Sequence, residues 1–226
     1  MTTSGTAAFN MDLTEIVEEA FERAGSELRS GYDLRTARRS LNLLFADWAN
    51  RGVNMWTFEQ GSIPLVQGTA TYDLPADTVD LLEQVVRTTT SGTQSDLTMS
   101  RISVSTYSSI PTKTSQGRPV QVLVNRTITP SVTVWPVPDQ SSKYTLIYWR
   151  MRRVQDAGNG VNTMDVPFRF IPCMVAGLAY YVAMKVPGGI DRLQILKQQY
   201  DEAWQLASDE DREKASARFV PRSIHI

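Results

Sequence analysis

Apolar residues near the start of the chain recur at steps of three and four, which predicts an amphipathic helix. Asp12 is the expected N-cap, and Glu15 three residues later completes a capping box. Gly25 is expected to end the helix, because glycine readily adopts the left-handed conformation found there. The apolar face consists of Leu13, Ile16, Val17, Ala20, Phe21 and Ala24.

A second helix is predicted from near Asp33 to about Asn50, with Arg51 and Gly52 closing it. Its apolar residues also recur at helical steps and therefore lie on one stripe. They are Leu34, Ala37, Leu41, Leu44 and Trp48.

From Met55 to about Met151 the apolar residues tend to alternate, which predicts β-strands. A hairpin is expected around Gln67–Gly68. The stretch Thr88–Gly117 is rich in Ser and Thr, and we expect a long excursion that either contacts a neighbour or is a mobile loop. Further strands are predicted at Leu82–Thr89, Val120–Val124, Val132–Val137 and Tyr144–Met151.

Helical periodicity returns near Pro167. A third helix, about Phe168 to Val186, is apolar nearly all round, which is typical of a central helix covered on most sides. Pro172 fits its first turn. A fourth helix is predicted from about Asp191 to Ala215, with a wholly solvated end at Asp209–Lys214. Its stripe consists of Leu193, Leu196, Tyr200, Ala203 or Trp204, and Ala207.

The order of elements predicts an α+β fold. The N- and C-terminal helical hairpins, residues 1–54 and 160–215, are expected to close into one four-helix bundle domain. Residues 55–159 are expected to form an inserted antiparallel β-sandwich or barrel. Residues 216–226 are predicted to be an extended C-terminal docking tail.

Composition narrows the possible functions. The formal net charge is −1, from 23 Lys+Arg against 24 Asp+Glu, whereas a dedicated duplex-DNA binder usually has a basic excess. The single cysteine, Cys173, excludes an internal disulfide framework. The longest apolar stretch, Phe168–Val186, is interrupted by charged residues and Pro172, so we interpret it as a core helix and expect no membrane association.

The usual residues of catalysis are scarce. The one histidine, His225, is the penultimate residue, and Cys173 lies in an apolar helix where a thiol usually acts as a small hydrophobe. With one of each, the common zinc sites cannot be built from this chain alone. Gly158-Asn159-Gly160 lacks the Lys-Ser/Thr of a phosphate-binding loop and is interpreted as a plain turn. We expect no catalytic residue, metal or cofactor.

Two alternatives to a structural protein stay open. Asp77 with Asp80, in a turn, is the best candidate for a carboxylate pair in a tail-associated hydrolase. The pairs Glu18–Glu19 and Asp209–Asp211 lie on helix faces that we expect to be solvated. The clusters Arg35/Arg38/Arg39 and Arg150/Arg152/Arg153 allow a small DNA-binding protein, although a solvated face with local ion pairs is the simpler interpretation.

The last segment, Ser216–Ile226, mixes arginines with apolar residues, which a disordered tail normally lacks. We therefore expect it to dock on a partner, with docking on the chain's own body or disorder as the alternatives. A partner could receive it as an added strand or in pockets for alternate side chains.

The chain resembles the head-to-tail adaptor proteins of short-tailed bacteriophages, also called connector, head-completion or tail tubular A-like proteins. The stretches that carry the resemblance are Tyr32–Gly52 leading into Met55-Trp56-Thr57, then Tyr72–Asp77, Val166–Pro172 opening an apolar helix, and Tyr200–Trp204. None of them is as specific as a metal or nucleotide motif. The resemblance covers most of the chain.

This resemblance implies a homododecameric ring docked under the portal protein, with genomic DNA passing through its lumen. It also implies a β module that faces the tail nozzle or tail tube protein, and a location in the neck of a virion assembled in the host cytoplasm. The C-terminal segment would reach into the portal. The expected portal contacts are Arg218, Phe219, Val220, Pro221, Arg222, Ile224 and Ile226.

Overall fold

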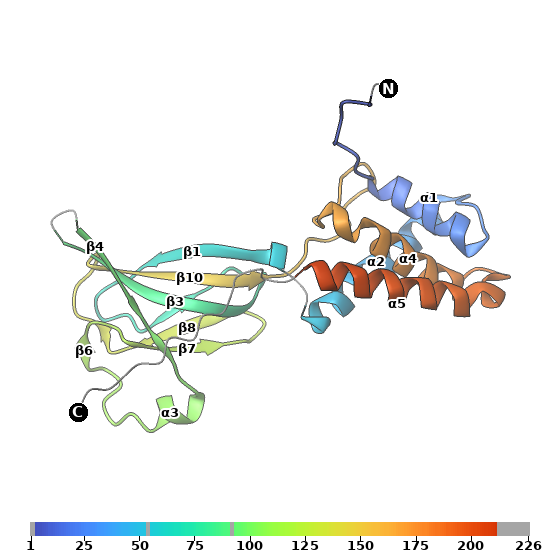
Figure 1. The fold of residues 1–226 in the computed structure, drawn as a ribbon. Helices are drawn as coiled ribbons and strands as arrows, with labels where there is room; N and C mark the ends of the chain where they lie inside the picture. Colours follow the sequence, from blue (N-terminus) through green and yellow to red (C-terminus); the bar gives the residue numbers. More distant parts are fainter. Residues whose placement is uncertain (1–2, 53–54, 91–92, 212–226) are drawn as a thin grey trace, which may run out of the picture. The chain divides into compact units, whose positions relative to one another are not determined.

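The computed structural model describes residues 3–52, 55–90 and 93–211. The chain folds into two compact units (Figure 1). The helical unit combines Met1–Met55 with Gln155–Ile226, and the β unit is Trp56–Val154. The structure is therefore mixed α+β, as predicted, and the described strands do not close into a barrel.

The helical unit contains four long helices and two short 3₁₀ segments among its described residues. These are α1 (Leu13–Ala24), α2 (Gly31–Arg51), η2 (Phe168–Phe170), α4 (Ile171–Ala183), η3 (Gly189–Arg192) and α5 (Leu193–Glu210), and the first residue of η1 (Met55–Thr57) also belongs to this unit.

Local sequence determines where α1 and α2 begin and end. Asp12 and Glu15 form the predicted capping box, and Gly25 ends α1 with a φ of 83°. The helix α2 begins at Gly31, before the predicted start near Asp33, because Ser30 and Asp33 form a second capping box. Gly52 ends α2 in the left-handed conformation.

The apolar helix α4 is the centre of the helical unit and contacts α1, α2 and α5. Pro172 lies in its first turn, as predicted. Gly177 permits close packing, because a Cβ atom there would come within 2.9 Å of both Leu44 and Tyr200. The helix stops at Ala183 and not at Val186, since the backbone N–H group of Lys185 donates to Val182 O, three residues back, as in a tightened last turn.

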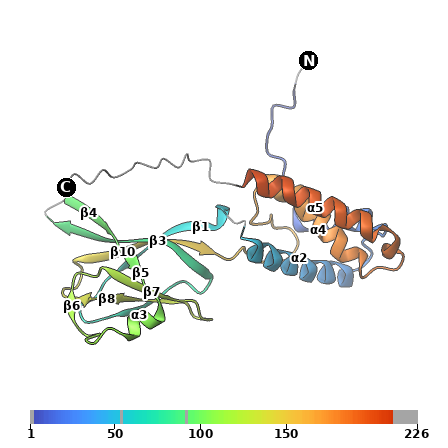
Figure 2. The same cartoon turned by 60° about the horizontal axis from the view of Figure 1, so that its bottom comes forward.

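An aromatic cluster joins α2, η2 and α5 in this core. Trp48 is fully buried, and its ring lies 5.5 Å from the rings of both Phe170 and Trp204. Its Nε1 donates a hydrogen bond of 3.0 Å to the Tyr200 hydroxyl. Figure 2 shows α2 and α5 on two different sides of α4.

The β unit contains ten strands and one short helix among its described residues. They are β1 (Phe58–Pro64), β2 (Thr71–Asp73), β3 (Thr78–Thr90), β4 (Thr93–Thr98), β5 (Ser100–Arg101), α3 (Val104–Ser108), β6 (Gln116–Gly117), β7 (Gln121–Asn125), β8 (Ser131–Trp135), β9 (Val137–Pro138) and β10 (Tyr144–Arg152).

Two four-stranded sheets, in the orders β1-β10-β3-β4 and β2-β8-β7-β5, share one apolar core, and β6 pairs with β9. The core draws Leu146 and Val86 from the first sheet and Val122 and Val134 from the second. Unlike the prediction, the unit is not wholly antiparallel, since β5 pairs with β7 and β6 with β9 in parallel.

The predicted hairpin around Gln67–Gly68 is wrong. The strand β1 pairs with β10, whereas β2 pairs with β8 of the other sheet. The chain crosses between sheets here, and the Tyr72 hydroxyl fastens the crossing by accepting from Val66 N at 2.9 Å and donating to Thr69 O at 2.9 Å. A local turn signal cannot distinguish such a crossing from a hairpin.

One further strand prediction needs correction, and the excursion can be described in more detail. The predicted strand Val132–Val137 is divided into β8 and β9, because Pro136 has no N–H group to continue the ladder. The excursion Thr88–Gly117 contains regular structure, namely β4, β5, α3 and β6.

Candidate interaction surfaces

Arginines at the end of β10 form ion pairs with carboxylates of the β unit. A bulge between Trp149 and Arg150 shifts the register against β3, and Arg150 is only 9% exposed. Its guanidinium donates to Asp77 Oδ1 at 2.6 Å and to Glu59 Oε2 at 2.8 Å. Arg152 Nε donates to Glu59 Oε1 at 2.6 Å. Arg150 and Arg152 connect β10 to β1 and to the turn before β3, whereas Arg153 is exposed, so the three do not form one basic patch.

The hydrogen bond and charge of Arg150 hold the pKa of Asp77 below its usual range. A general acid in a glycosidase needs a raised pKa, so this environment is unsuited to that role. Asp80 belongs to a separate network and accepts from Arg101 Nη2 at 2.8 Å. The geometry therefore does not favour the hydrolase alternative.

The predicted solvated end of the fourth helix is wrong at Asp211. Its carboxylate is buried, forms an ion pair with Arg169 of η2, and accepts from Met55 N at 3.1 Å. The other helical carboxylates behave differently, since Glu18 is exposed and Glu19 forms an ion pair with Arg23 one turn later. Asp211 thus fastens the end of α5 within the helical unit.

The glycine-containing turn at residues 158–160 presents its carbonyl groups to the helices. Gly158 O accepts from Arg38 Nη1 at 3.1 Å, and Gly160 O accepts from Thr14 N at 3.3 Å. A phosphate site would need N–H groups in these positions. The turn is therefore a structural connection, as the sequence indicates.

Cys173 lies in α4 and is buried. Burial raises the pKa of its thiol to about 12, so the sulfur is protonated at neutral pH. Within the described parts of the chain, no three His, Cys, Asp or Glu side chains gather where they could hold a metal ion. His225 and the seven predicted portal contacts, Arg218 to Ile226, lie outside the described residues.

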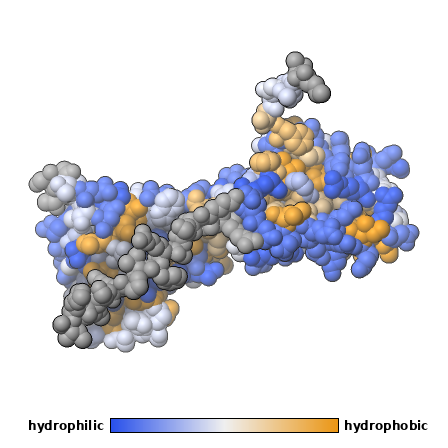
Figure 3. Space-filling view, in the orientation of Figure 1, coloured by the Kyte–Doolittle hydropathy of each residue, from blue (hydrophilic) through white to orange (hydrophobic). Residues whose placement is uncertain are grey.

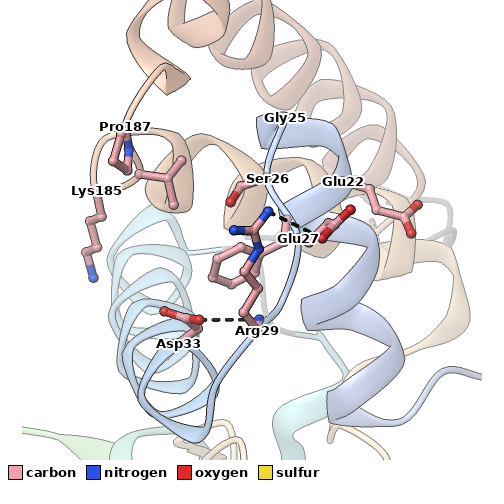
Figure 4. A pocket seen from close by; sticks show the side chains of 10 residues that line it. Glu22, Gly25, Ser26, Glu27, Arg29, Asp33, Lys185 and Pro187 are labelled. Carbon is pink, nitrogen blue, oxygen red and sulfur yellow. Dashed lines mark hydrogen bonds and ion pairs between the residues drawn. The ribbon is translucent and has the colours of Figure 1, made fainter.

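A hollow of about 610 Å³ lies at one end of the helical unit, between the end of α1, the loop to α2 and the residues after α4 (Figure 4). Its rim is charged and contains an ion pair of 3.5 Å between Arg29 and Glu27. Small-molecule pockets are mostly apolar and enclosing, and this hollow with its charged rim does not resemble one.

The outer side of α2 carries an exposed apolar and basic surface, which we call the α2 face: Tyr32, Arg35, Arg39 and Leu43. Tyr32 is 68% and Leu43 54% exposed. Their spacing of eleven residues places them on one side of the helix, opposite the buried stripe. Sequence reasoning missed this surface, although the spacing is visible in the sequence.

The outer side of α5 carries a corresponding surface, which we call the α5 face: Ile195, Glu202 and Leu206. Ile195 is 61% and Leu206 74% exposed. Figure 3 shows apolar patches of this kind within a largely hydrophilic surface of the helical unit. Large exposed apolar side chains that share a helix face are typical of protein contact sites.

The comparison with known families places these surfaces in context. The model of the SU10 adaptor protein family matches residues 11–222. The chain belongs to the SU10 adaptor protein family. The match begins just before α1, includes both units, and confirms the predicted resemblance to a phage head-to-tail adaptor.

Membership of the SU10 adaptor family identifies the chain as a structural adaptor protein of phage. The family match extends over Arg218–Arg222 of the tail and stops before Ile224. No curated protein matches the chain. None of the helices in the described residues has the length and apolar character needed to cross a membrane.

Proposed function

We propose that the chain is the subunit of a head-to-tail adaptor ring that docks on the portal protein, extends the DNA channel and provides the attachment surface for the tail nozzle or tail tube. The observation that carries the proposal is the family match over residues 11–222. A ring of twelve copies in the virion neck, through which genomic DNA passes, follows from the same resemblance.

Each part of the chain has a proposed role. Residues 1–54 and 160–215 form a four-helix bundle domain that builds the ring, and residues 55–159 form the domain that meets the tail components. The packing of α1, α2 and α5 on the apolar helix α4 supports a rigid ring-building domain. A near-neutral chain also suits a channel in which DNA must slide, since many phosphate contacts would retain it.

Residues 216–226 are the proposed portal-docking tail. Phe219, Val220, Pro221, Ile224 and Ile226 supply apolar contacts, and Arg218 and Arg222 supply charge. A segment of this composition gains little by staying in water, and binding energy concentrates in a few such aromatic, aliphatic and arginine anchors.

The test is to mix the purified chain with portal rings from the same phage and to measure the mass of the complex and image it. We expect added density on the portal with the full-length chain. Deleting Ser216–Ile226 should leave the circular dichroism spectrum of the chain intact but abolish attachment. Truncated chains that still decorate portal rings would refute the role of the tail, and a full-length chain that does not bind would refute the proposed function.

A further inference from the structure

The charges on α2 are not balanced within the described structure. The helix has four arginines and two aspartates. Asp47 pairs with Arg51, Asp33 caps the helix, and Arg38 holds the turn at residues 158–160. Arg35 and Arg39 are exposed, and neither forms an ion pair with any carboxylate in the part of the chain that the structure describes.

The surroundings of Arg39 add to this positive charge. Lys185, two residues after the end of the neighbouring helix α4, donates a hydrogen bond of 2.6 Å to Ser40 Oγ. Its pKa is lowered, first by burial and then by the positive charge of Arg39. Two cations therefore repel each other beside the α2 face, and an approaching carboxylate would relieve that repulsion.

The helix α5 has the opposite balance, with four carboxylates and one lysine. Glu202 lies at the middle of the α5 face and accepts a hydrogen bond of 2.8 Å from the Gln198 amide. Among the described residues it has no ion pair with a basic side chain. The α5 face is therefore an acidic surface with an exposed apolar residue at each end.

The α2 face and the α5 face have the same residue spacing and opposite charges. Arg39 follows Tyr32 by seven residues and precedes Leu43 by four, and Glu202 has the same separations from Ile195 and Leu206. On an α-helix, each set of three residues spans about 16 Å along the helix axis and lies on one side of the helix. Each face thus places one charge between two apolar anchors, and the charges are opposite.

One chain carries both faces, on helices that lie on different sides of α4 (Figure 2). Contact between unlike faces of identical copies is heterologous and closes into a ring when the rotation allows it. The acidic helix α1 is the other candidate partner for the α2 face. It is less suitable, because none of its large apolar residues is exposed.

We propose that the α2 face of one copy docks on the α5 face of the next copy, with Arg39 near Glu202 and the apolar anchors around them. This inference rests on the proposed ring and names the surfaces that build it. Burying the anchors provides affinity, and repulsion between like charges disfavours α2–α2 and α5–α5 contacts.

The experiment uses full-length chains with Arg39→Glu or Glu202→Lys, assembled on portal rings and counted by native mass spectrometry. Either reversal alone places like charges across every contact, and we expect about a tenfold or greater loss of complete rings. An equal mixture should restore them, because alternating copies place opposite charges at every contact. Leu43→Ser and Leu206→Ser, which leave the charge unchanged, should also reduce assembly.

Controls separate this contact from other possibilities. Arg118→Glu and Glu18→Lys reverse exposed charges elsewhere, and neither should change assembly. Circular dichroism establishes that each variant is folded. Rescue of Arg39→Glu by Glu18→Lys, and not by Glu202→Lys, would place α1 opposite α2 and overturn the inference.

The experiment distinguishes a wrong α2–α5 contact from a wrong adaptor role. If wild-type rings form on the portal and neither reversal reduces them, the α2–α5 contact is wrong while the adaptor role stands. If the wild-type chain forms no ring on the portal, the proposed function fails first.

Discussion

In the β unit, the arginines of β3 and β10 bind carboxylates of the same unit: Arg150 contacts Asp77 and Glu59, and Arg87 forms two hydrogen bonds with Asp96. In the helical unit, Arg35 and Arg39 are exposed and, among the described residues, without a carboxylate partner. We infer that the α2 face, where arginines unpaired in the described structure share one helix side with exposed Tyr32 and Leu43, is suited to a partner. Charges paired within a unit hold its own strands together, whereas charges left unpaired beside exposed apolar residues are suited to a partner.

The apolar cores of the two units also differ in the residues that form them. The core of the helical unit is centred on large aromatic rings at Trp48, Phe170 and Trp204. The core of the β unit consists mainly of aliphatic residues from two sheets, together with Tyr144 and Tyr148. The helical unit thus adds a cluster of large rings to its buried aliphatic residues.

The largest expected effect comes from Trp48→Ala. Removing a fully buried indole creates a cavity and leaves the Tyr200 hydroxyl without its donor, which should lower the free energy of unfolding by about 3–5 kcal/mol. Urea unfolding followed by helical circular dichroism measures it. Trp149→Ala, at a site that is 46% exposed, is the matched control and should cost about 1 kcal/mol or less. Equal losses at both sites would contradict the importance of the aromatic core.

Arg150→Ala should have the next largest effect. It leaves Asp77 and Glu59 without their shared partner, but both carboxylates remain partly hydrated, so we expect a loss of about 1–3 kcal/mol. Arg118→Ala, which removes an exposed arginine of the same unit, should change stability by less than about 0.5 kcal/mol. Unfolding followed by tryptophan fluorescence distinguishes the two variants. If Arg150→Ala leaves the free energy of unfolding unchanged, this network does not hold the strands together.

The smallest expected effect is the pH dependence of the Asp77 contact. The folded-state pKa of Asp77 is lowered, so its contribution is fully present above the ordinary value of 3.8 and is lost as pH falls through the folded pKa. The stability difference between wild type and Asp77→Asn should therefore be about 1 kcal/mol at pH 7 and should decrease as the pH falls below 3.8. Asp73→Asn, at an exposed site, is the control, and a difference that persisted unchanged in acid would contradict the assignment.

The helical unit was largely predictable because its signals are local. The capping box at Asp12 and Glu15, the glycine after α1, and the placement of Pro172 in the first turn of α4 each depend on residues within one turn. The capping box at Ser30 and Asp33 is an equally local signal, since its two residues lie three positions apart.

The β unit was predictable only strand by strand. The sequence located β3, β7 and β10 to within a few residues, yet it could not show that β1 and β2 enter different sheets. Strand partners are separated by many residues, and pairing depends on which apolar faces meet in the common core.

The candidate surfaces likewise depend partly on local sequence and partly on long-range packing. Hydrophobic period alone established the amphipathic helices, the central helix α4 and the buried position of Cys173, because a helix repeats over a few residues. Only the tertiary structure decided that Arg150 turns inward and that Asp211 is buried against Arg169. It also decided that Leu43 and Leu206 remain exposed. A side chain's exposure depends on what packs over it, and residues far away in the sequence determine that packing.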